Sequence, residues 1–486
     1  MEADVVRRQP GLRVTAALLG LLALACATGG GGEPGRVEGR RGAPNIVLFI
    51  ADDLGATDIE PYGNPVVRTP NLKRLAGESL RFTQAFAASP TCSPSRSALY
   101  TGLMPFRNGA HGNHTGVKEG TRSIAHYFQA LGYRVALAGK LHVGPHEVFP
   151  FELVPETNVP EPGYEGKGVL YTDLNVAAVD AWLAGLPEDQ PFLLIVADHS
   201  PHVVWPEHPE YDPAAVDVPL THIDTPELRR ARARYYTDVT KMDRNVGLLL
   251  ESLERRGFGG NTLVVFTADQ GPQWPFAKWS LYDAGIQVPL VVRWPGRVRP
   301  GASTEALVSH VDLLPTLVEV AGGKAPEGID GRSFLPVLLG RADRHREVVF
   351  ATHTGDGAMN RSPARMLRTE RYKYILNLAP DTLYTTHMDR VKAEGYWDSW
   401  LERAREDGRA AAVLRRYHHR PPEELYDVVA DPYEQHNLAA DPRYAGRVRE
   451  FRQRLARWRA EQGDAETGPG PLPVTARGRP VAPYIF

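Results

Sequence analysis

Four mostly apolar runs of strand length in this 486-residue chain are each followed within two residues by a polar side chain. The runs cover residues 45–50, 133–138, 192–197 and 262–267. Continuous apolar runs of this length are typical of parallel strands that are buried on both faces of a sheet. The carboxyl ends of parallel strands meet at one edge of an α/β sheet, where such folds bind ligands. The repetition therefore predicts an α/β fold with one polar site at that edge.

The side chains after these runs are carboxylates, imidazoles, an amine and an amide. They are Asp52, Asp53, Lys140, His142, His199, His202, Asp269 and Gln270. Lys140 and His142 stand two apart, so they point the same way if the chain is extended there. Two adjacent carboxylates such as Asp52 and Asp53 are costly to bury unless they are solvated or bind a metal. Taken alone, the two aspartates also fit a turn with a helix cap, and the lysine and histidine also fit a surface.

Residues 91–102 read TCSPSRSALYTG and predict a short helix. Pro94 fits the first helical turn, and Gly102 fits the position just past the end. Cys92 would lie at the helix N-terminus, where free N–H groups and the dipole stabilise negative charge. Arg96 lies one turn further on and is predicted to reach back toward Cys92. A lone cysteine without such a setting is usually a small buried hydrophobe.

The N-terminus is typical of an exported protein. Residues 1–25 read as a signal peptide, with arginines before an apolar run and small residues before Cys26. The segment resembles a bacterial lipoprotein signal, in which Cys26 carries lipid, and glycine-rich residues 26–43 read as a flexible tether. We therefore expect a periplasmic or outer-membrane-anchored lipoprotein. The chain has two cysteines, so the mature protein would have no disulfide if Cys26 is lipidated or removed.

The rest of the chain is predicted to form two parts. Residues 44–340 would form the α/β domain, which includes a long helix over residues 226–256 and a strand over residues 288–292. From residue 341 the strands are shorter and a final helix covers residues 444–462, which is typical of a smaller α+β domain with an antiparallel sheet. The formal net charge of −2 gives no reason to expect nucleic acid as a partner. Basic groups for an anionic substrate must therefore gather locally.

Together, these motifs resemble the sulfatase family, whose hallmark is C-x-P-S-R, here Cys92 to Arg96. The resemblance covers residues 45–441. It includes residues 51–53, 139–142, 198–202 and 269–271, Lys278, and the late segments 424–427 and 431–438. It implies an alkaline-phosphatase-like sandwich with a mixed, largely parallel central sheet, plus a small C-terminal sheet domain. Residues 139–152 and 95–109 most resemble the heparan N-sulfatase (sulfamidase) subgroup, and the loop 353–365 lies where that subgroup approaches the sugar.

The resemblance also implies the site. A maturation enzyme would oxidise Cys92 to formylglycine, whose hydrated aldehyde is the nucleophile. Asp52, Asp53, Asp269 and Gln270 would bind a divalent metal, usually Ca²⁺, with Mg²⁺ as the alternative. Gln270 departs from the asparagine or histidine that is commoner in the family. Sulfate would be bound by Arg96, Lys140, His142, His202 and Lys278, and His199 would stand behind them. His202 is the predicted general acid, and His142 would take a proton from the hydrated aldehyde.

The predicted activity is hydrolysis of sulfate from a sulfated sugar or glycosaminoglycan fragment, foremost N-sulfoglucosamine of heparan or heparin. Three alternatives stay open. The first is an O-sulfatase that acts on glycans or aryl sulfates. The second is a phosphonate or phosphate ester hydrolase of the same fold, although Lys140 and Lys278 occupy the region that a second metal would need. The third is a non-catalytic glycan-binding lipoprotein whose Cys92 is unconverted.

Overall fold

An eight-stranded mixed sheet lies at the centre of the fold, with β1 (Asn45–Ala51) among its inner strands. The structure is a computed structural model that describes residues 42–161, 165–356 and 360–468. The predicted signal peptide, Cys26 and nearly all of the predicted tether lie outside these residues, so those predictions stay predictions. Among the described residues, no helix is both long and apolar enough to cross a membrane.

The strands predicted from the sequence are the inner strands of this sheet. β1 pairs in parallel with both β8 (Phe192–Ala197) and β9 (Thr262–Ala268), and β4 (Arg134–Gly139) pairs in parallel with β8. The strand order is β11, β2, β10, β9, β1, β8, β4, β5. The outer strands are β2 (Leu80–Phe82), β5 (Glu152–Leu153), β10 (Leu290–Arg293) and β11 (Ala302–Thr304). Because β10 runs antiparallel to β9, the sheet is mixed but largely parallel, which confirms the predicted fold class.

The register of the inner strands brings their carboxyl ends to one level. Ile50 on β1 is opposite Ala197 on β8 and Thr267 on β9, and Gly139 on β4 is also opposite Ala197. Backbone hydrogen bonds continue this alignment past the strands, since Asp269 N donates to Ala51 O at 3.0 Å. The residues after each strand therefore emerge side by side.

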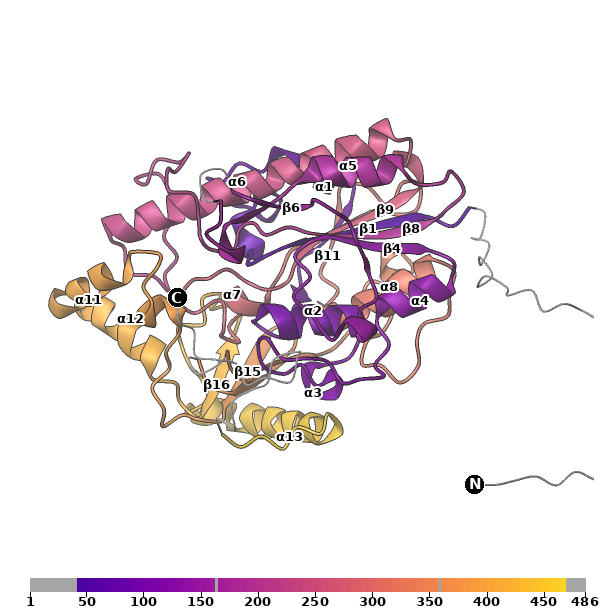
Figure 1. Cartoon of the computed structure of the whole chain (residues 1–486). Helices are drawn as coiled ribbons and strands as arrows, with labels where there is room; N and C mark the ends of the chain where they lie inside the picture. Colours follow the sequence, from indigo (N-terminus) through magenta and orange to yellow (C-terminus); the bar gives the residue numbers. More distant parts are fainter. Residues whose placement is uncertain (1–41, 162–164, 357–359, 469–486) are drawn as a thin grey trace, which may run out of the picture. The chain divides into compact units, whose positions relative to one another are not determined.

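Helices cover both faces of the sheet (Figure 1). α1 (Pro70–Gly77), α5 (Val176–Ala184) and α6 (Pro226–Arg255) lie on one side of the inner strands. α2 (Cys92–Thr101), α4 (Ile124–Ala130) and α8 (Leu313–Val320) lie on the other. α6 buries an apolar side that includes Val246, Leu249 and Leu253, as its sequence predicts. A 3-10 turn, His310–Asp312, leads directly into α8.

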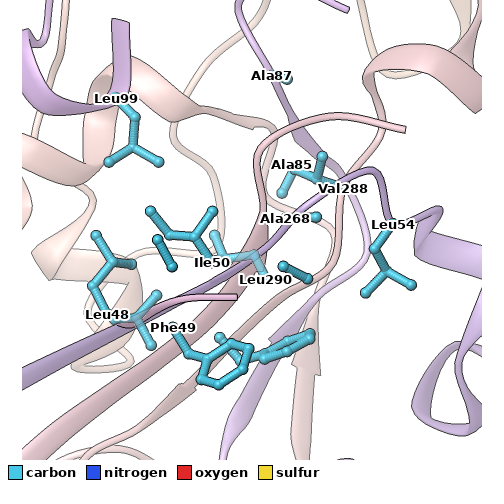
Figure 2. Close-up of a cluster of buried hydrophobic side chains, with 14 of the residues drawn as sticks. Leu48, Phe49, Ile50, Leu54, Ala85, Ala87, Leu99, Ala268, Val288 and Leu290 are labelled. Atoms are coloured by element: carbon cyan, nitrogen blue, oxygen red, sulfur yellow. The ribbon is translucent and has the colours of Figure 1, made fainter. Parts of the chain in front are cut away.

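The core is built around β1, all of whose residues are buried. Figure 2 shows Leu48, Phe49 and Ile50 of β1 near Ala268, Val288, Leu290 and Leu99. The rings of Phe49 and Phe266 stack at 5.6 Å between centroids. Each fully buried large apolar side chain of this kind stabilises the fold by about 1.5–3 kcal/mol. This core supports the strand ends that carry the polar residues.

A second, four-stranded antiparallel sheet forms the C-terminal part, as predicted. Its order is β13 (Val349–His353), β14 (Ala364–Arg368), β15 (Tyr372–Asn377) and β16 (Glu423–Asp427). α13 (Ala445–Glu461) packs on it, and Trp458 stacks on Phe350 at 4.4 Å between ring centroids. The amphipathic helices α11 (Trp397–Glu406) and α12 (Gly408–His418) also belong to this part of the chain and were not predicted. The domain boundary at residue 340 stays a prediction.

The remaining elements are short. They are the strands β3 (Ala85–Phe86), β6 (Asn158–Pro160), β7 (Thr172–Leu174) and β12 (Val308–Ser309), and the helices α3 (Pro105–Asn108), α7 (Asp283–Ile286), α9 (Leu335–Leu338) and α10 (His387–Arg390).

Candidate active site

The carboxyl ends of the inner strands assemble a compact group of charged side chains. Asp52 and Asp53 follow β1, and Asp269 and Gln270 follow β9; all four are buried. Lys140 follows β4, after Gly139, which has a φ of +87°. A Cβ atom at residue 139 would lie 2.0 Å from the carbonyl oxygen of Ala197, so only glycine fits there. This close approach of β4 to β8 places Lys140 directly over the end of the sheet.

Cys92 is the first residue of α2, and its N-cap, Thr91, has an extended backbone. Its Sγ accepts a hydrogen bond from Nε2 of Gln270 at 3.3 Å and lies 3.9 Å from Oδ1 of Asp53. Burial raises the pKa of the Cys92 thiol to about 12, although Lys140 and Lys278 lower it in part. The unmodified side chain is therefore a neutral thiol at physiological pH, and it is a poor nucleophile in that form.

Arg96 packs behind the carboxylates. Its Nε donates to Oδ2 of Asp269 at 2.8 Å, a second nitrogen lies 3.6 Å from Oδ1 of Asp52, and a third donates to the carbonyl oxygen of Lys140 at 3.1 Å. The guanidinium is fully buried. The sequence predicted that Arg96 reaches toward Cys92, but its guanidinium pairs with the two aspartates, because opposite charges attract it more strongly than a neutral thiol. Arg96 thus holds Asp52 and Asp269 in place.

Two lysines also contact the strand-end carboxylates. Nζ of Lys278 donates to Oδ2 of Asp53 at 2.6 Å, and Nζ of Lys140 forms an ion pair with Oδ2 of Asp52. Burial alone would lower the pKa of each lysine, but Asp52 raises that of Lys140 and Asp53 raises that of Lys278 above the ordinary value. Both amines therefore carry a positive charge.

The acidic residues fit a hard divalent cation. Asp52, Asp53 and Asp269, with the side-chain oxygen of Gln270, form an all-oxygen donor set of the kind that Ca²⁺ and Mg²⁺ prefer. Oδ1 of Asp52 and Oε1 of Gln270 are buried without a hydrogen-bond partner. Burial, followed by repulsion from Asp52, raises the pKa of Asp269 to about 7. Nε2 of Gln270 contacts Asp53. Rotating the side-chain amide by half a turn would exchange its nitrogen and oxygen, so that the oxygen occupies this position.

Two histidines predicted to be functional line the same site. Nδ1 of His202 donates a hydrogen bond to the carbonyl oxygen of Val203 at 2.5 Å. Nε2 of the same ring lies 3.7 Å from Oδ2 of Asp53. His142 has a φ of +46°, which is a left-handed conformation. The chain is therefore not extended at this residue, and the condition under which Lys140 and His142 would point the same way is not met. Burial, and then nearby lysines, hold the pKa of both histidines well below the ordinary value. Both rings are neutral in the resting protein.

These groups line one end of a cavity of about 940 Å³. Of the predicted residues, those on its wall are Asp52, Cys92, Lys140, His142, His199, His202 and Lys278. Asp53, Arg96, Asp269 and Gln270 pack directly behind that wall through the contacts above. His199 contacts Oδ1 of Asn158 at 2.7 Å rather than a charged group. The structure thus brings all the predicted residues together, seven of them on the cavity wall and four directly behind it.

The cavity wall also contains residues that the sequence did not reveal. They are Asn113, His114, Trp279, Asp356, His387 and Glu394, among others. They lie in loops or short helices without a recognisable motif. The two available signals were the position of Trp279 next to Lys278 and the predicted role of the loop 353–365 near the sugar. Asp356 belongs to that loop.

Comparisons with known proteins agree with this architecture. The sulfatase family model matches residues 44–323, and the model of the C-terminal region of N-sulphoglucosamine sulphohydrolase matches residues 272–391. An ulvan-active sulfatase of Formosa agariphila is 33% identical over 434 residues, with 87% of this chain and 81% of the relative covered. Human N-sulphoglucosamine sulphohydrolase is 32% identical over 467 residues, with 86% and 90% covered. The chain belongs to the sulfatase family and is a hydrolase.

Solved structures with low sequence identity share the fold. One, a complex with D-glucosamine-2-N,6-O-disulfate, has a TM-score of 0.66 at 20% identity and covers 88% of this chain and 99% of that one. The phosphonate monoester hydrolase of Agrobacterium radiobacter has a TM-score of 0.65 at 21% identity, with 86% and 96% covered. At these identities the similarity shows the fold alone.

Proposed function

We propose that this sulfatase removes the N-linked sulfate from glucosamine residues of heparan or heparin fragments. The observation that carries this proposal is the match of residues 272–391 to the C-terminal region of N-sulphoglucosamine sulphohydrolase. Those residues include Lys278, Trp279, Asp356 and His387, which line the cavity. The matched segment therefore supplies the wall against which the sugar would lie. The 32% identity with the human enzyme of that name extends over most of both chains.

We further propose that Cys92 is converted to formylglycine by a maturation enzyme. The neutral thiol found here would be a weak nucleophile, whereas a hydrated aldehyde supplies one hydroxyl to attack and a second to release the product. The place of Cys92 at the N-terminus of α2 suits an oxyanion at this position. Because Cys92 is buried, its thiol is also shielded from competing reactions such as oxidation.

Asp52, Asp53, Asp269 and Gln270 are the residues that would hold a divalent cation, Ca²⁺ first and Mg²⁺ as the alternative. Such a cation supplies positive charge that lowers the pKa of a nearby hydroxyl and polarises the sulfate oxygens. Arg96 would keep the two aspartates in position, since its guanidinium contacts both.

The remaining side chains have separate tasks in the proposed reaction. The charged amines of Lys140 and Lys278 attract the sulfate and screen its charge from an incoming nucleophile. His202 would donate a proton to the leaving nitrogen or oxygen, and the negative charge of the bound sulfate favours protonation of a ring that is neutral at rest. His142 lies on the same wall and would accept a proton from residue 92.

Release of free sulfate from a panel of substrates tests the proposal. The panel contains N-sulfoglucosamine, 6-O-sulfoglucosamine, an ulvan oligosaccharide, an aryl sulfate and a phosphonate monoester. Turnover that is fastest on N-sulfoglucosamine supports the proposal, and turnover confined to the O-sulfated or aryl compounds overturns it. The mass of the peptide containing residue 92 is measured on the same preparation. An unconverted thiol after coexpression with a maturation enzyme would favour the non-catalytic glycan-binding alternative.

Hydrolysis of an O-sulfated polysaccharide is the second candidate function. It is favoured by the ulvan-active sulfatase of Formosa agariphila, which is 33% identical to this chain over 87% of its length. The same panel separates the two candidates, because it contains N-sulfoglucosamine, 6-O-sulfoglucosamine and an ulvan oligosaccharide as separate substrates. Export and a lipid on Cys26 also remain proposals, and labelling of the expressed protein with a fatty acid, compared with Cys26→Ser, tests the lipid.

A further inference from the structure

A histidine and an aspartate outside the predicted site form a pair on the cavity wall. Nδ1 of His114 lies 3.3 Å from Oδ1 of Asp356, and both residues line the cavity that contains Cys92 and Lys278. His114 comes from the loop after α3, and Asp356 comes from the segment after β13. The catalytic roles proposed above use neither residue.

The Asp356 carboxylate is fixed at both of its oxygens. Oδ2 accepts a hydrogen bond from Nε1 of Trp279 at 2.9 Å, while Oδ1 faces His114. Burial alone would raise the pKa of Asp356, but the hydrogen bond and charge of His114 hold it below the ordinary value. A buried carboxylate that stays ionised orients an imidazole, because it accepts the Nδ1–H and directs the opposite nitrogen away from itself.

The backbone around His114 is built to hold this orientation. His114 has a φ of +62°, a left-handed conformation that costs a residue with a Cβ atom free energy and is typical of functional positions. The neighbouring Asn113 donates its N–H to the carbonyl oxygen of Gly355 at 3.0 Å. The side chain of Asn113 accepts the N–H of Ser93 at 3.2 Å. The loop is thereby tied both to the segment of Asp356 and to the first turn of α2.

The ring of His114 lies beside His142 on the cavity wall. Its centroid is 4.8 Å from that of His142. Its side chain is 31% exposed, whereas that of Asp356 is 2% exposed. Lys140 and Lys278, the cations that would bind sulfate, contact the strand-end carboxylates, whereas His114 contacts Asp356. His114 is thus the outer member of the pair, placed where the group that carries the sulfate would lie.

We propose that His114, positioned by Asp356, binds the sugar part of the substrate next to its sulfate and so determines specificity for sulfated sugars over simple sulfates. This inference rests on the proposed function, because it needs a sulfated sugar as substrate. His114 contacts the sugar through a hydrogen bond from or to its ring, and Asp356 is the positioning residue. The hydrogen bond from the buried Trp279 N–H keeps the Asp356 carboxylate aligned with the His114 ring.

The test compares His114→Ala, Asp356→Asn and the double variant with the wild type. The measurements are KM and kcat on the panel's best sulfated sugar, and the inhibition constant of inorganic sulfate, which occupies only the sulfate-binding end. We expect KM for the sugar to rise about tenfold or more in His114→Ala, as for loss of one hydrogen bond to substrate, with the sulfate inhibition constant within about twofold. Asp356→Asn should show a smaller rise of the same kind, and the double variant should be no worse than His114→Ala.

His146→Ala is the matched control, since His146 is an exposed histidine close in sequence to His142 and is not on the cavity wall. It should behave as the wild type. Equal losses of sugar turnover and of sulfate binding, or unchanged KM in His114→Ala, would overturn the inference. Failure of the proposed function is visible separately, because it appears in the wild type as absence of turnover on every N-sulfated sugar.

Discussion

Two clusters of buried charge among the described residues differ in what surrounds them, one at the strand ends of the large sheet and one beside the C-terminal sheet. In the second, Nζ of Lys373 lies 2.6 Å from Asp283 and 2.8 Å from Glu434, and Arg368 also pairs with Asp283. None of these four side chains lines the large cavity. In the first, Asp52, Lys140 and Lys278 face that cavity.

The contrast shows that burial of charge does not by itself mark a functional site. The Lys373 cluster joins α7 to β15 and the loop after β16, so its charges pair with one another and connect segments of the fold. The charges of the strand-end cluster are also paired, but three of its members face the cavity. The Lys373 cluster should therefore govern stability, and the strand-end cluster should govern turnover and ligand binding.

The largest expected effect is on turnover and comes from Cys92→Ala. Removing a nucleophile costs at least about 10⁴-fold in kcat, while truncating the small side chain of residue 92 to a methyl group should change the free energy of unfolding by less than about 1 kcal/mol. Sulfate release and urea unfolding measure the two quantities. Ser97→Ala, on the same helix but away from the cavity wall, is the control and should retain activity. Full activity in Cys92→Ala would remove Cys92 from the proposed reaction.

The next effect is on stability and comes from Lys373→Met. It leaves Asp283 and Glu434 without their shared cation, and breaking a buried pair in this way costs about 3–5 kcal/mol. The kcat of the folded fraction should not change. Lys324→Met, which removes an exposed ion pair with Glu327, should cost no more than about 1 kcal/mol. A comparable loss in both variants would abolish the distinction between the two clusters.

Metal binding should stabilise the strand-end cluster alone. After removal of metal with a chelator, addition of Ca²⁺ at a hundred times its dissociation constant should raise the free energy of unfolding by about 2.7 kcal/mol. Mg²⁺ is tested in parallel. Asp269→Asn should lose most of this gain, whereas Asp381→Asn, at an exposed position, should keep it. A gain that persists in Asp269→Asn would place the cation elsewhere.

The smallest effect concerns acid stability. Burial alone would raise the pKa of Asp283, but Arg368 and Lys373 lower it to about 2 from an ordinary 3.8. Because the folded-state pKa is depressed, Asp283 stabilises the fold above pH 4, and about 2 kcal/mol of this is lost as the pH falls from 4 to 2. The free energy of unfolding, measured with urea across that pH range, should therefore fall more steeply with decreasing pH in the wild type than in Asp283→Asn. Identical slopes would contradict the assigned cause.

Local pattern was enough to predict the four inner strands of the large sheet and the polar residues that follow them. Apolar runs identified β1, β4, β8 and β9, and the polar residues after them had to meet once those strands paired in parallel. The direction of the chain at His142 was not predictable, because a left-handed turn in a non-glycine residue depends on its surroundings. Likewise, His114 and Asp356 are 242 positions apart and meet only through loop packing that no local pattern encodes. The roles assigned to the site residues stay predictions.

Conversion of Cys92 to formylglycine, as proposed above, would have to precede the burial of this residue during synthesis of the protein. Its side chain is enclosed by Gln270 and Asp53, and β1 pairs with β9 across more than two hundred residues of chain. Contacts so distant in sequence form late in folding, since the whole intervening chain must be made and its loop closed first. A maturation enzyme would therefore have its opportunity while β9 is still unpaired. Once the sheet closes, a molecule with an unmodified thiol would be folded and stable but permanently inactive.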